Sequence, residues 1–463
     1  MIDYGLFPQV VLGLSVPLII SLFVVLRPPR AAAAAVLGAE MFLPELVNFR
    51  IPFLPPLDKH NLPYIAVLIG CVLTCPNRVL RLPKERWFLW LSLALLVGGV
   101  ATGMTNDSPI PRFNLSTLPA LTIKDGLFTV INRLTRVALP FFLGTALFRT
   151  SRDLRDLLTT FVVAGLVYIP FCLIELRLSP QWHNWIYGYG QHAFDQTLRW
   201  GGYRPMVFMA HGLALARFFV VAALVPLILR RGKRILLGVP IDVWAVVLFI
   251  MLVLCKSTGA IIYVLCAFPA LVWLSARTRA SLAMVLGAVV FLYPLLRTGD
   301  LVPTRAVLDA AGALGPARAQ SLAFRFENED VLLAKARSHF VFGWGEYGRN
   351  TVYDGYGGEA VGDGFWIIEV GITGLWGFVC SFGILLTPIF LAGRRLRRIG
   401  APTDRQLVAG TAFLLAILAV DLLPNGLWAV YPFLIAGALS SVSRDLAFGS
   451  VMAGDSLTDE LTT

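Results

Sequence analysis

The sequence predicts an all-α polytopic membrane protein, with about 12–13 transmembrane helices and one large, partly helical loop outside the membrane. Of the 463 residues, 57% are hydrophobic and only 14% are charged, and the mean hydropathy is +0.74. The apolar residues are gathered in blocks of about 17–25 residues, long enough to cross a hydrocarbon core. The spans should be helices because lipid offers no partner to an unpaired backbone group. We expect residues 1–463 to form a single integral membrane domain.

About thirteen apolar segments are candidates for these spans. In chain order they are Val10–Leu26, Ala31–Val47, Asn61–Cys75, Trp87–Met104, Gly126–Phe148, Leu157–Leu176, Met206–Leu229, Val239–Leu254, Gly259–Ser275, Ser281–Leu296, Gly364–Leu391, Gln406–Val420 and Asn425–Ser441. The second and third are the weakest, because Glu40, Pro44 and Glu45 interrupt one and the other is short. No Lys or Arg precedes Arg27, so the first segment lacks the basic region of a cleaved signal peptide and is expected to be retained.

The connections between segments are of two alternating kinds, which predicts the orientation. One kind is short and basic: Arg27/Arg30, Arg78/Arg81/Lys84/Arg86, Arg149/Arg152/Arg155, Arg230/Arg231/Lys233/Arg234, Arg277/Arg279 and Arg394/Arg395/Arg397/Arg398. The other kind is longer and mixed in charge: Asn48–His60, Thr105–Asp125, Arg177–Pro205 and Thr298–Gly362. Basic connections stay in the cytoplasm. The N-terminus is therefore expected outside and the C-terminus inside, with residues 447–463 as a disordered cytoplasmic tail.

The predicted arrangement of membrane spans and connections explains two features of the composition. The net charge of +11 resides mostly in the basic connections, so it does not indicate nucleic-acid binding. The six cysteines lie in or beside apolar segments, and no His or further Cys pair completes a metal site. We expect free thiols packed in the core rather than disulfides or zinc ligands.

The longest polar stretch, 298–362, contains the first candidate site residues. Its portion 320–340 has helical spacing, and Arg325 and Arg337 are candidates to bind a phosphate, because guanidinium matches phosphate oxygens in a two-pronged geometry. The alternative is an ion pair between Arg325 and Glu329 on an amphipathic helix at the membrane interface. The loop also has acids of the type that bind divalent cations, but without metal-binding spacing, so a solvated acidic face is favoured. These acids are Glu327, Glu329, Asp330, Asp354, Glu359 and Asp363.

Asp363 differs from the other acids in its position at the start of an apolar segment. Burial there raises the pKa of a carboxylate towards a value useful for a general base. The alternative is a helix N-cap, which satisfies free backbone N–H groups, and the two roles are compatible.

The shorter polar loop, 177–205, is rich in Trp and Tyr. Such residues gather at membrane interfaces, but Trp200 and Tyr203 are also candidates for stacking on sugar rings. Arg204 lies where this loop re-enters the apolar region. His211 follows inside the segment, either as a core residue or as a catalytic group.

Several further charges lie within or beside apolar segments. Arg133 and Arg136 share a helix face and either bind substrate or extend towards the interface. Lys256, in the sequence KSTG, is either an anion ligand or a solvated turn residue. Glu175 and Arg217, together with Arg133 and Arg136, are also compatible with a transporter, because charges inside helix bundles mark solute paths.

An ordered set of motifs runs from about Lys124 onward: GGYRPMVFMAHG, KSTGA, FRFENED, GWGEYG, and a segment that opens with Asp363-Gly364 and continues through Gly374 and Gly377. In this order the motifs resemble the O-antigen ligase and O-antigen polymerase superfamily of bacterial surface-polysaccharide enzymes. The ligases of that superfamily carry a His where this chain has Asp363. The spacing to the glycines is retained, which favours a polymerase or exopolysaccharide enzyme.

The resemblance implies a GT-C-like membrane enzyme of the bacterial inner membrane with its active site facing the periplasm. Such an enzyme moves a glycan from undecaprenyl diphosphate to a sugar hydroxyl without a metal or other cofactor. A chain-length regulator and a flippase of the same pathway are the partners implied. The diphosphate-binding arginines map onto Arg204 and Arg325. Asp363 is then the candidate base, with His211 and His339 as reserves. Alternatives are a ligase of lipopolysaccharide synthesis and a flippase or other transporter.

Overall fold

The computed structural model describes residues 5–51, 54–112, 117–232, 234–313, 315–353 and 357–459. Within these ranges the chain is helical, and its paired strands are limited to four hairpins of two-residue strands. Eight helices are long and apolar enough to cross a membrane. The prediction of a polytopic, all-helical membrane protein is thereby confirmed at this level.

The helices and strands are, in chain order, α1 (Leu6–Val25), α2 (Pro28–Phe42), β1 (Asn48–Phe49), β2 (Leu57–Asp58), α3 (Leu62–Thr74), α4 (Pro76–Val79), α5 (Arg86–Thr105), β3 (Ile110–Pro111), β4 (Thr117–Leu118), α6 (Ile123–Arg133), the π-helical η2 (Leu134–Ala138), α7 (Leu139–Leu147), α8 (Ser151–Leu178), α9 (Trp182–Tyr187), η3 (Phe194–Thr197), β5 (Leu198–Arg199), β6 (Gly202–Tyr203), α10 (Gly212–Leu229), β7 (Ile235–Leu236), β8 (Val239–Pro240), α11 (Ile241–Leu254), α12 (Thr258–Trp273), α13 (Ala276–Thr298), α14 (Thr304–Ala313), α15 (Pro316–Arg337), α16 (Phe365–Arg395), η4 (Leu396–Arg398), α17 (Pro402–Asp421) and α18 (Tyr431–Asp459).

Every predicted apolar segment coincides with a helix, but several helix ends differ from the prediction. The segment predicted to begin at Met206 becomes helical only at Gly212, and the one predicted from Asn425 becomes helical only at Tyr431. Hydropathy does not distinguish a helix from a buried extended segment, which explains both differences. Helix α18 continues to Asp459, into the region for which the sequence predicts disorder, and residues 460–463 lie outside the described ranges.

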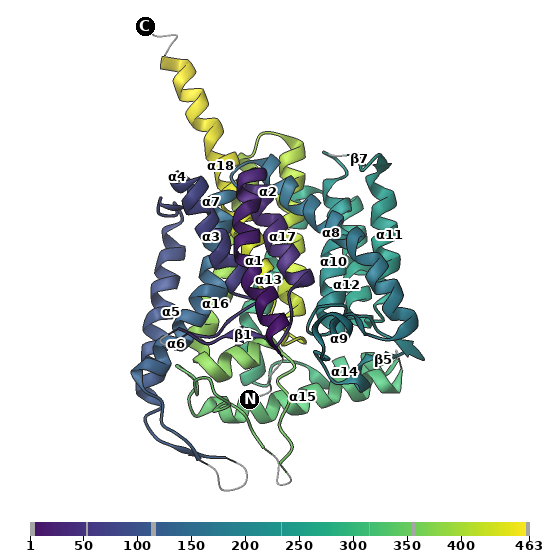
Figure 1. The fold of residues 1–463 in the computed structure, drawn as a ribbon. Coiled ribbons are helices and arrows are strands. Elements are labelled where there is room, and N and C mark those ends of the chain that lie inside the picture. The colour runs from purple at the N-terminus through teal and green to yellow at the C-terminus, as the bar shows by residue number, and fades with distance from the viewer. Residues whose placement is uncertain are drawn as a thin grey trace.

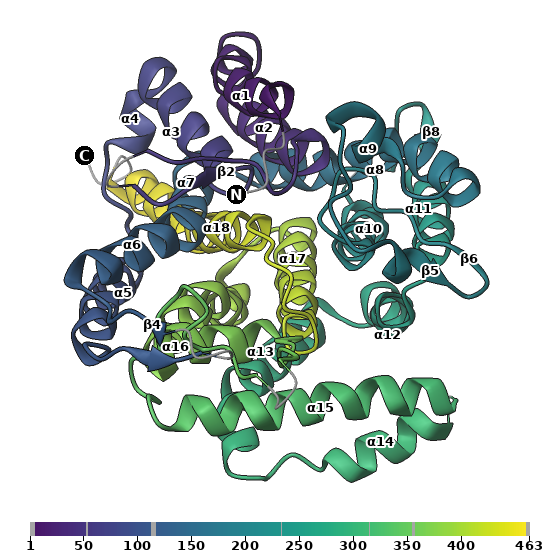
Figure 2. The same ribbon diagram turned by 60° about the horizontal axis from the view of Figure 1, so that its bottom comes forward.

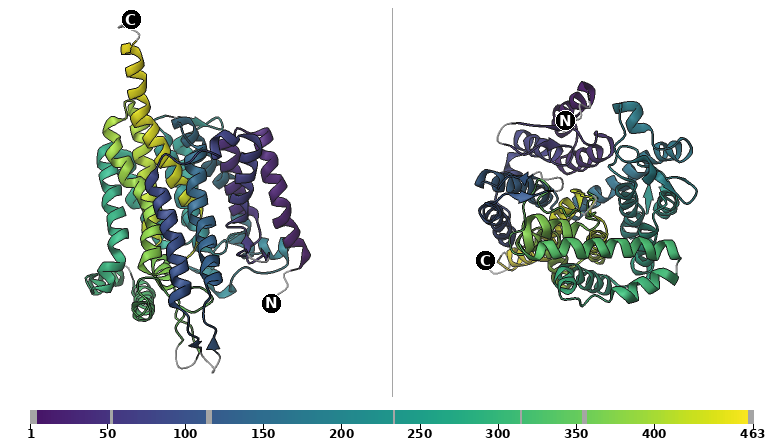
Figure 3. Two further views of the ribbon diagram at one scale, coloured as in Figure 1. Left: turned by 90° about the vertical axis from the view of Figure 1, so that its left-hand side faces the viewer. Right: turned by 90° about the horizontal axis from the view of Figure 1, so that it is seen from below.

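The helices run between two ends of the bundle (Figure 1). Helix α4, the β7 region and the C-terminal part of α18 lie at one end, which we call the basic end because basic connections gather there. Lys233 of these connections lies outside the described residues. At the other end, α14 and α15 lie side by side across the bundle (Figure 2). We call this pair of helices the arm, and its end of the bundle the arm end. Seen from below, the arm lies in front of the bundle and crosses it (Figure 3, right).

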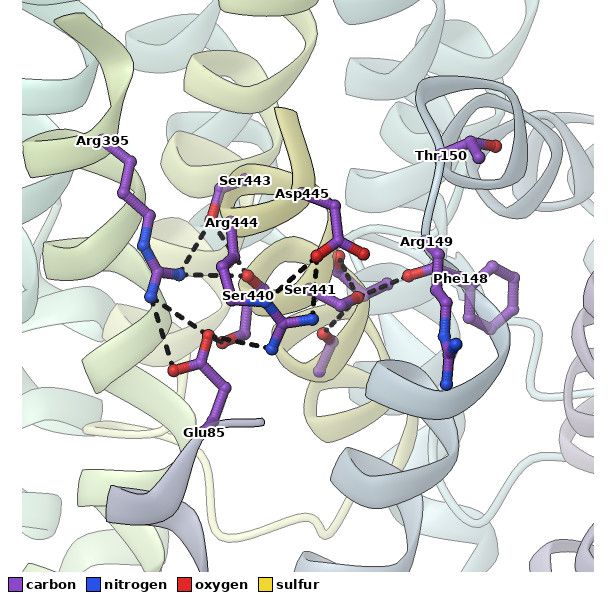
Figure 4. A network of polar contacts seen from close by, with 12 residues as sticks. Glu85, Phe148, Arg149, Thr150, Arg395, Ser440, Ser441, Ser443, Arg444 and Asp445 are labelled. Carbon is purple, nitrogen blue, oxygen red and sulfur yellow. Dashed lines mark hydrogen bonds and ion pairs between the residues drawn. The ribbon is translucent and has the colours of Figure 1, made fainter. Parts of the chain in front are cut away.

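Ion pairs fix the helices to one another at the basic end (Figure 4). Glu85, just before α5, accepts hydrogen bonds from Arg395 of α16 at 3.1 Å and from Ser440 of α18 at 3.2 Å. Arg444 of α18 lies 3.6 Å from the same carboxylate. This acid therefore joins α5, α16 and α18, helices far apart in sequence.

The charges predicted within the apolar segments are mostly neutralised by partners. Arg133 lies 3.0 Å from Glu369 in the bundle interior, and Arg136 forms an ion pair with Asp58. The interpretation that Arg133 extends towards the interface is therefore wrong, whereas Arg136 reaches an acid of the polar connection 48–60. Such pairing is expected because an isolated charge at membrane depth is costly. All six cysteines are free, and four of them are buried.

Candidate functional site

The site is built on a buried, non-helical segment, 204–211, which leads into α10. Backbone of this kind is tolerated at membrane depth only where protein groups satisfy it. Glu175 of α8 supplies acceptors: its Oε2 accepts from the N–H groups of Met206 and Val207, each at 2.8 Å. Its Oε1 accepts from Trp182 at 3.1 Å. Glu175 thus orders the chain around Arg204.

Three more polar side chains complete this support. The hydroxyl of Tyr168 accepts from Phe208 N–H at 3.1 Å. Lys59 donates to the carbonyl of Phe208 at 3.0 Å, and Gln191 donates to that of Val207 at 3.0 Å. The segment is therefore held from α8, from the 177–205 loop and from the turn before α3.

Arg204 is buried without an acidic partner. Only 2% of its surface is exposed, and its Nε and Nη2 atoms have no hydrogen-bond partner among the described residues. The side chain lies against Gly212 at the start of α10, where a Cβ would come within 2.5 Å of Nε. Burial and the charges of Arg199 and Arg325 lower the pKa of Arg204 to about 10, so the guanidinium remains charged at neutral pH.

The second part of the site forms where α15 crosses the beginning of α16. Arg325 Nε lies 3.8 Å from Asp363 Oδ2, and Arg325 also donates to the carbonyl of Pro424. Asp363 is not the helix N-cap, because Gly364 occupies that position. The predicted pair between Arg325 and Glu329 is also absent, since the Glu329 carboxylate is buried and accepts from Trp366 at 3.2 Å. Residues distant in sequence have replaced the expected local partners.

A cavity of about 170 Å³ opens beside this ion pair. Its lining combines both members of the pair with apolar and aromatic side chains: Tyr293, Leu322, Arg325, Phe326, Glu329, Asp363, Leu423 and Pro424. Burial raises the pKa of Asp363, while the positive charge of Arg325 opposes the rise. The cavity therefore presents a carboxylate and a guanidinium on a partly apolar surface.

Electrostatic interactions connect the two parts. The charge of Arg325 acts on both Arg204 and His211, and Arg199 adds a further positive charge to the same two residues. We call Arg199, Arg204 and Arg325 the arginine cluster. Asp363 is the acid paired with it. Arg325 and Asp363 line the same cavity, whereas Arg204 is not among the residues that line it.

No family model matches the chain, and no curated protein matches its sequence.

His211 has a structural role in this arrangement. Its Nδ1 accepts from Leu213 N–H at 3.0 Å, which caps α10, and its Nε2 lies 3.1 Å from Gln196 Oε1. Both ring nitrogens of His211 are therefore engaged within the chain. The residue is therefore the N-cap of α10 and not, as predicted, a residue inside the helix.

Three other predicted residues lie on the loops around the cluster. Lys256, in the turn between α11 and α12, extends to Gly202, where a Cβ would come within 2.5 Å of its Nζ. Trp200 is 56% exposed, and Tyr203 is half-buried with its ring 6.3 Å from that of Phe194. The β5–β6 hairpin thus carries two aromatic rings and approaches a lysine immediately before Arg204.

Two predicted residues lie elsewhere. His339 lies two residues beyond the end of α15, whose last residue, Arg337, is roughly 18 Å along the helix from Arg325. Its ring packs on Trp344 with a centroid distance of 3.8 Å. Arg337 is exposed and donates to the carbonyl of Thr298 at 3.0 Å, which links α15 to the end of α13. The structure does not bring either residue to the arginine cluster.

The acids of the long loop do not gather into a metal site. Among the described residues, no group of three or more His, Cys, Asp or Glu side chains is arranged to hold a metal ion. Glu329 is buried, so the prediction of a solvated face is wrong for this acid. Asp354 lies outside the described residues.

The sequence did not indicate the roles of two residues that shape the site. Glu175 stood out as a charge within an apolar segment, but nothing in the sequence indicated the backbone amides that it binds. Gly212 leaves the space that the Arg204 side chain fills. A glycine inside a predicted apolar segment gives no sequence signal for such a role.

Proposed function

We propose that this chain is an inverting glycosyltransferase that moves a glycan from undecaprenyl diphosphate to a sugar hydroxyl, in the manner of a surface-polysaccharide polymerase. The observation that carries the proposal is the buried guanidinium of Arg204, which has no acidic partner and is repelled by the positive charge of Arg325. Two such cations suit a ligand with several negative charges, and a diphosphate fits this description. The substrate class, a lipid-linked glycan, comes from the ordered sequence motifs that resemble those of O-antigen polymerases and ligases.

The proposed chemistry assigns one role to each group. The acceptor hydroxyl attacks the anomeric carbon and gives its proton to the carboxylate of Asp363. The bond between that carbon and the diphosphate oxygen breaks, and the electron pair leaves with the diphosphate. Arg204 and Arg325 stabilise the negative charge that develops there, each by about 3 kcal/mol. Fixed cations of this kind favour the transition state because they need no reorganisation.

The environment of Asp363 supports its assignment as the base. A general base works best when its pKa approaches the operating pH, and burial raises the pKa of Asp363 in that direction. His211 is the weaker candidate, because both of its ring nitrogens are already engaged.

The remaining intramembrane charges favour an enzyme over the alternative of a transporter. Arg133 and Arg217 are paired with Glu369 and Asp421, at 3.0 and 2.6 Å. A buried pair of this kind is costly to separate, which suits a fixed framework better than a moving solute path.

Reconstitution tests the proposal directly. The full-length protein, purified into nanodiscs, is given an undecaprenyl-diphosphate-linked oligosaccharide, and products are resolved by mass spectrometry. We expect lengthened glycan and released undecaprenyl diphosphate. Arg204→Ala and Arg325→Ala should each lower the rate by about a hundredfold or more. Arg318→Ala, at an exposed position on the same helix as Arg325, should retain the rate.

The products also separate the alternatives. Elongated lipid-linked glycan indicates a polymerase, whereas transfer only to added lipid A core indicates a ligase. Wild-type protein that forms no new glycosidic bond but moves lipid-linked glycan between the leaflets of liposomes would reject the proposal in favour of a transporter.

We further propose that all of the predicted apolar segments cross the inner membrane of a bacterium, with the arginine cluster on the periplasmic side. A flippase and a chain-length regulator would act on the same lipid-linked substrate before and after the reaction.

A further inference from the structure

Helix α13 carries two buried arginines at opposite ends of one stripe, and only one of them has an acidic partner. The buried face repeats at helical spacing: Ala276, Arg279, Ala280, Ala283, Gly287, Val290, Pro294 and Arg297. At the arm end, Arg297 lies 2.7 Å from Asp330 and 3.4 Å from Glu329. At the basic end, Arg279 forms no ion pair with any described residue, although only 2% of its surface is exposed. The contrast within one helix shows that Arg279 lacks the partners expected for a buried charge.

The polar atoms of Arg279 also lack hydrogen-bond acceptors. Its Nε and Nη2 atoms are buried without a partner among the described residues. Leaving such donors unsatisfied in a protein interior is costly, and more so when the group is charged. An acceptor from outside the chain would remove this cost.

The surroundings of Arg279 are positive. Arg231, in the turn after α10, repels it electrostatically, and the exposed Arg277 lies two positions away on the same helix. Helical side chains lean towards the helix N-terminus, so the side chain of Arg279 is directed towards the first turn of α13. The first N–H groups of a helix lack internal acceptors and favour anions. In this turn Ser275 caps one of them, the N–H of Thr278, at 3.1 Å.

We propose that Arg279, Arg231 and the first turn of α13 form a binding site for a phosphate group at the basic end of the bundle. The source is either an anionic phospholipid headgroup or a free phosphate ion, which share the same recognition chemistry. Basic pockets between membrane helices on the cytoplasmic side bind anionic headgroups, so the lipid is the expected occupant. The site is at the opposite end of α13 from the arm and is independent of the proposed transfer reaction.

Native mass spectrometry of the full-length protein tests the lipid source. Protein released from phosphatidylcholine nanodiscs that contain phosphatidylglycerol should retain bound phosphatidylglycerol. Arg279→Gln should weaken this binding about tenfold, because a forked, charged donor is removed. Arg277→Gln removes the same charge at an exposed position and should have a much smaller effect. Arg279→Lys keeps the charge but not the forked geometry, and it should also bind phosphatidylglycerol more weakly than wild type. This variant provides the test if Arg279→Gln does not fold.

A second measurement tests the free ion. In detergent without phospholipid, sodium phosphate is compared with sodium chloride at equal ionic strength, and thermal unfolding is followed. Stabilisation by phosphate that is lost in Arg279→Gln, without a lipid effect, assigns the site to a free phosphate. Equal lipid retention in wild type, Arg279→Gln and Arg279→Lys, together with no specific phosphate effect, overturns the proposal.

Discussion

Gly212 allows Arg204 to occupy its position, and this makes the glycine a test of the site at the scale of one residue. A Cβ on Gly212 would lie 2.5 Å from Nε and 2.6 Å from Cδ of Arg204, closer than such atoms approach. We therefore predict that Gly212→Ala displaces the guanidinium and lowers the transfer rate by about tenfold or more, while the protein still folds. The rate and the unfolding temperature of the purified variant are the measurements.

A matched control is Gly259→Ala. Gly259 is also at the start of a helix, α12, but a Cβ added there would have no described atom within 4 Å. This variant should retain full activity. Equal loss in both variants would show that helix initiation, and not the position of Arg204, explains the effect.

The pH dependence of the reaction provides a second prediction at this scale. Asp363 must be ionised to accept a proton, so activity should fall as the pH drops through the pKa of this residue. Burial raises that pKa above the ordinary value of about 3.9. Arg325 opposes the rise, so Arg325→Gln should move the acid limb of kcat/KM to higher pH as well as lowering the rate. An acid limb that stays in place in Arg325→Gln, or that persists in Asp363→Asn, would exclude Asp363 as the base.

The residue scale is also where prediction from sequence was least complete. Arg325 and Glu329 have the spacing of a helical ion pair, yet each binds a partner from another part of the chain. Spacing identifies neighbours within one helix but contains no information about what packs across it. Arg204 could be selected as a candidate because a charge at the edge of an apolar segment is conspicuous. Its lack of an acidic partner became visible only with the fold.

At the scale of elements, Gly374 allows α16 to pair with the segment that follows α15. It adopts a φ of 69° in the middle of α16, which interrupts the helix. The residues after α15 use the interruption: Phe340 accepts from Leu375 N–H at 2.8 Å, and Ile372 accepts from Gly345 N–H at 2.9 Å. The break in α16 therefore provides backbone partners for the segment that follows α15.

We predict that Gly374→Ala destabilises the protein by roughly 2–4 kcal/mol, because a Cβ is strained at positive φ and would overlap the Val341 carbonyl. The measurement is the unfolding temperature in detergent. Gly287→Ala, inside α13, is the control, since its Cβ would make only ordinary contacts at 3.5 Å. A Gly374→Ala protein as stable as this control would mean that the break in α16 is not required.

Prediction from sequence was more successful for elements than for residues. Each apolar segment coincides with a helix because burial in lipid or protein demands a continuous apolar stretch. The helix starts at Gly212 and Tyr431 were not predicted, because the apolar residues before them are buried in non-helical backbone. For the stretch before Gly212, side chains such as Glu175 supply the hydrogen bonds that a helix would otherwise provide.

At the scale of the whole molecule, α1 begins at the arm end of the bundle and α18 extends beyond the basic end (Figures 1 and 3). The basic connections gather at the end towards which α18 runs, and basic connections remain in the cytoplasm. The arm and the arginine cluster should then face the periplasm, where a lipid-linked glycan would be available after it has crossed the membrane.

Labelling of single cysteines tests this orientation. In a background without the six native cysteines, Arg305→Cys on α14 and Arg277→Cys in the first turn of α13 both place a thiol at an exposed position. We predict that a membrane-impermeant maleimide labels Arg305→Cys in spheroplasts, and labels Arg277→Cys only after the membrane is permeabilised. The reverse pattern would place the arginine cluster in the cytosol, where nucleotide-activated sugars are available. A lipid diphosphate donor would then no longer be needed to explain the buried guanidinium of Arg204.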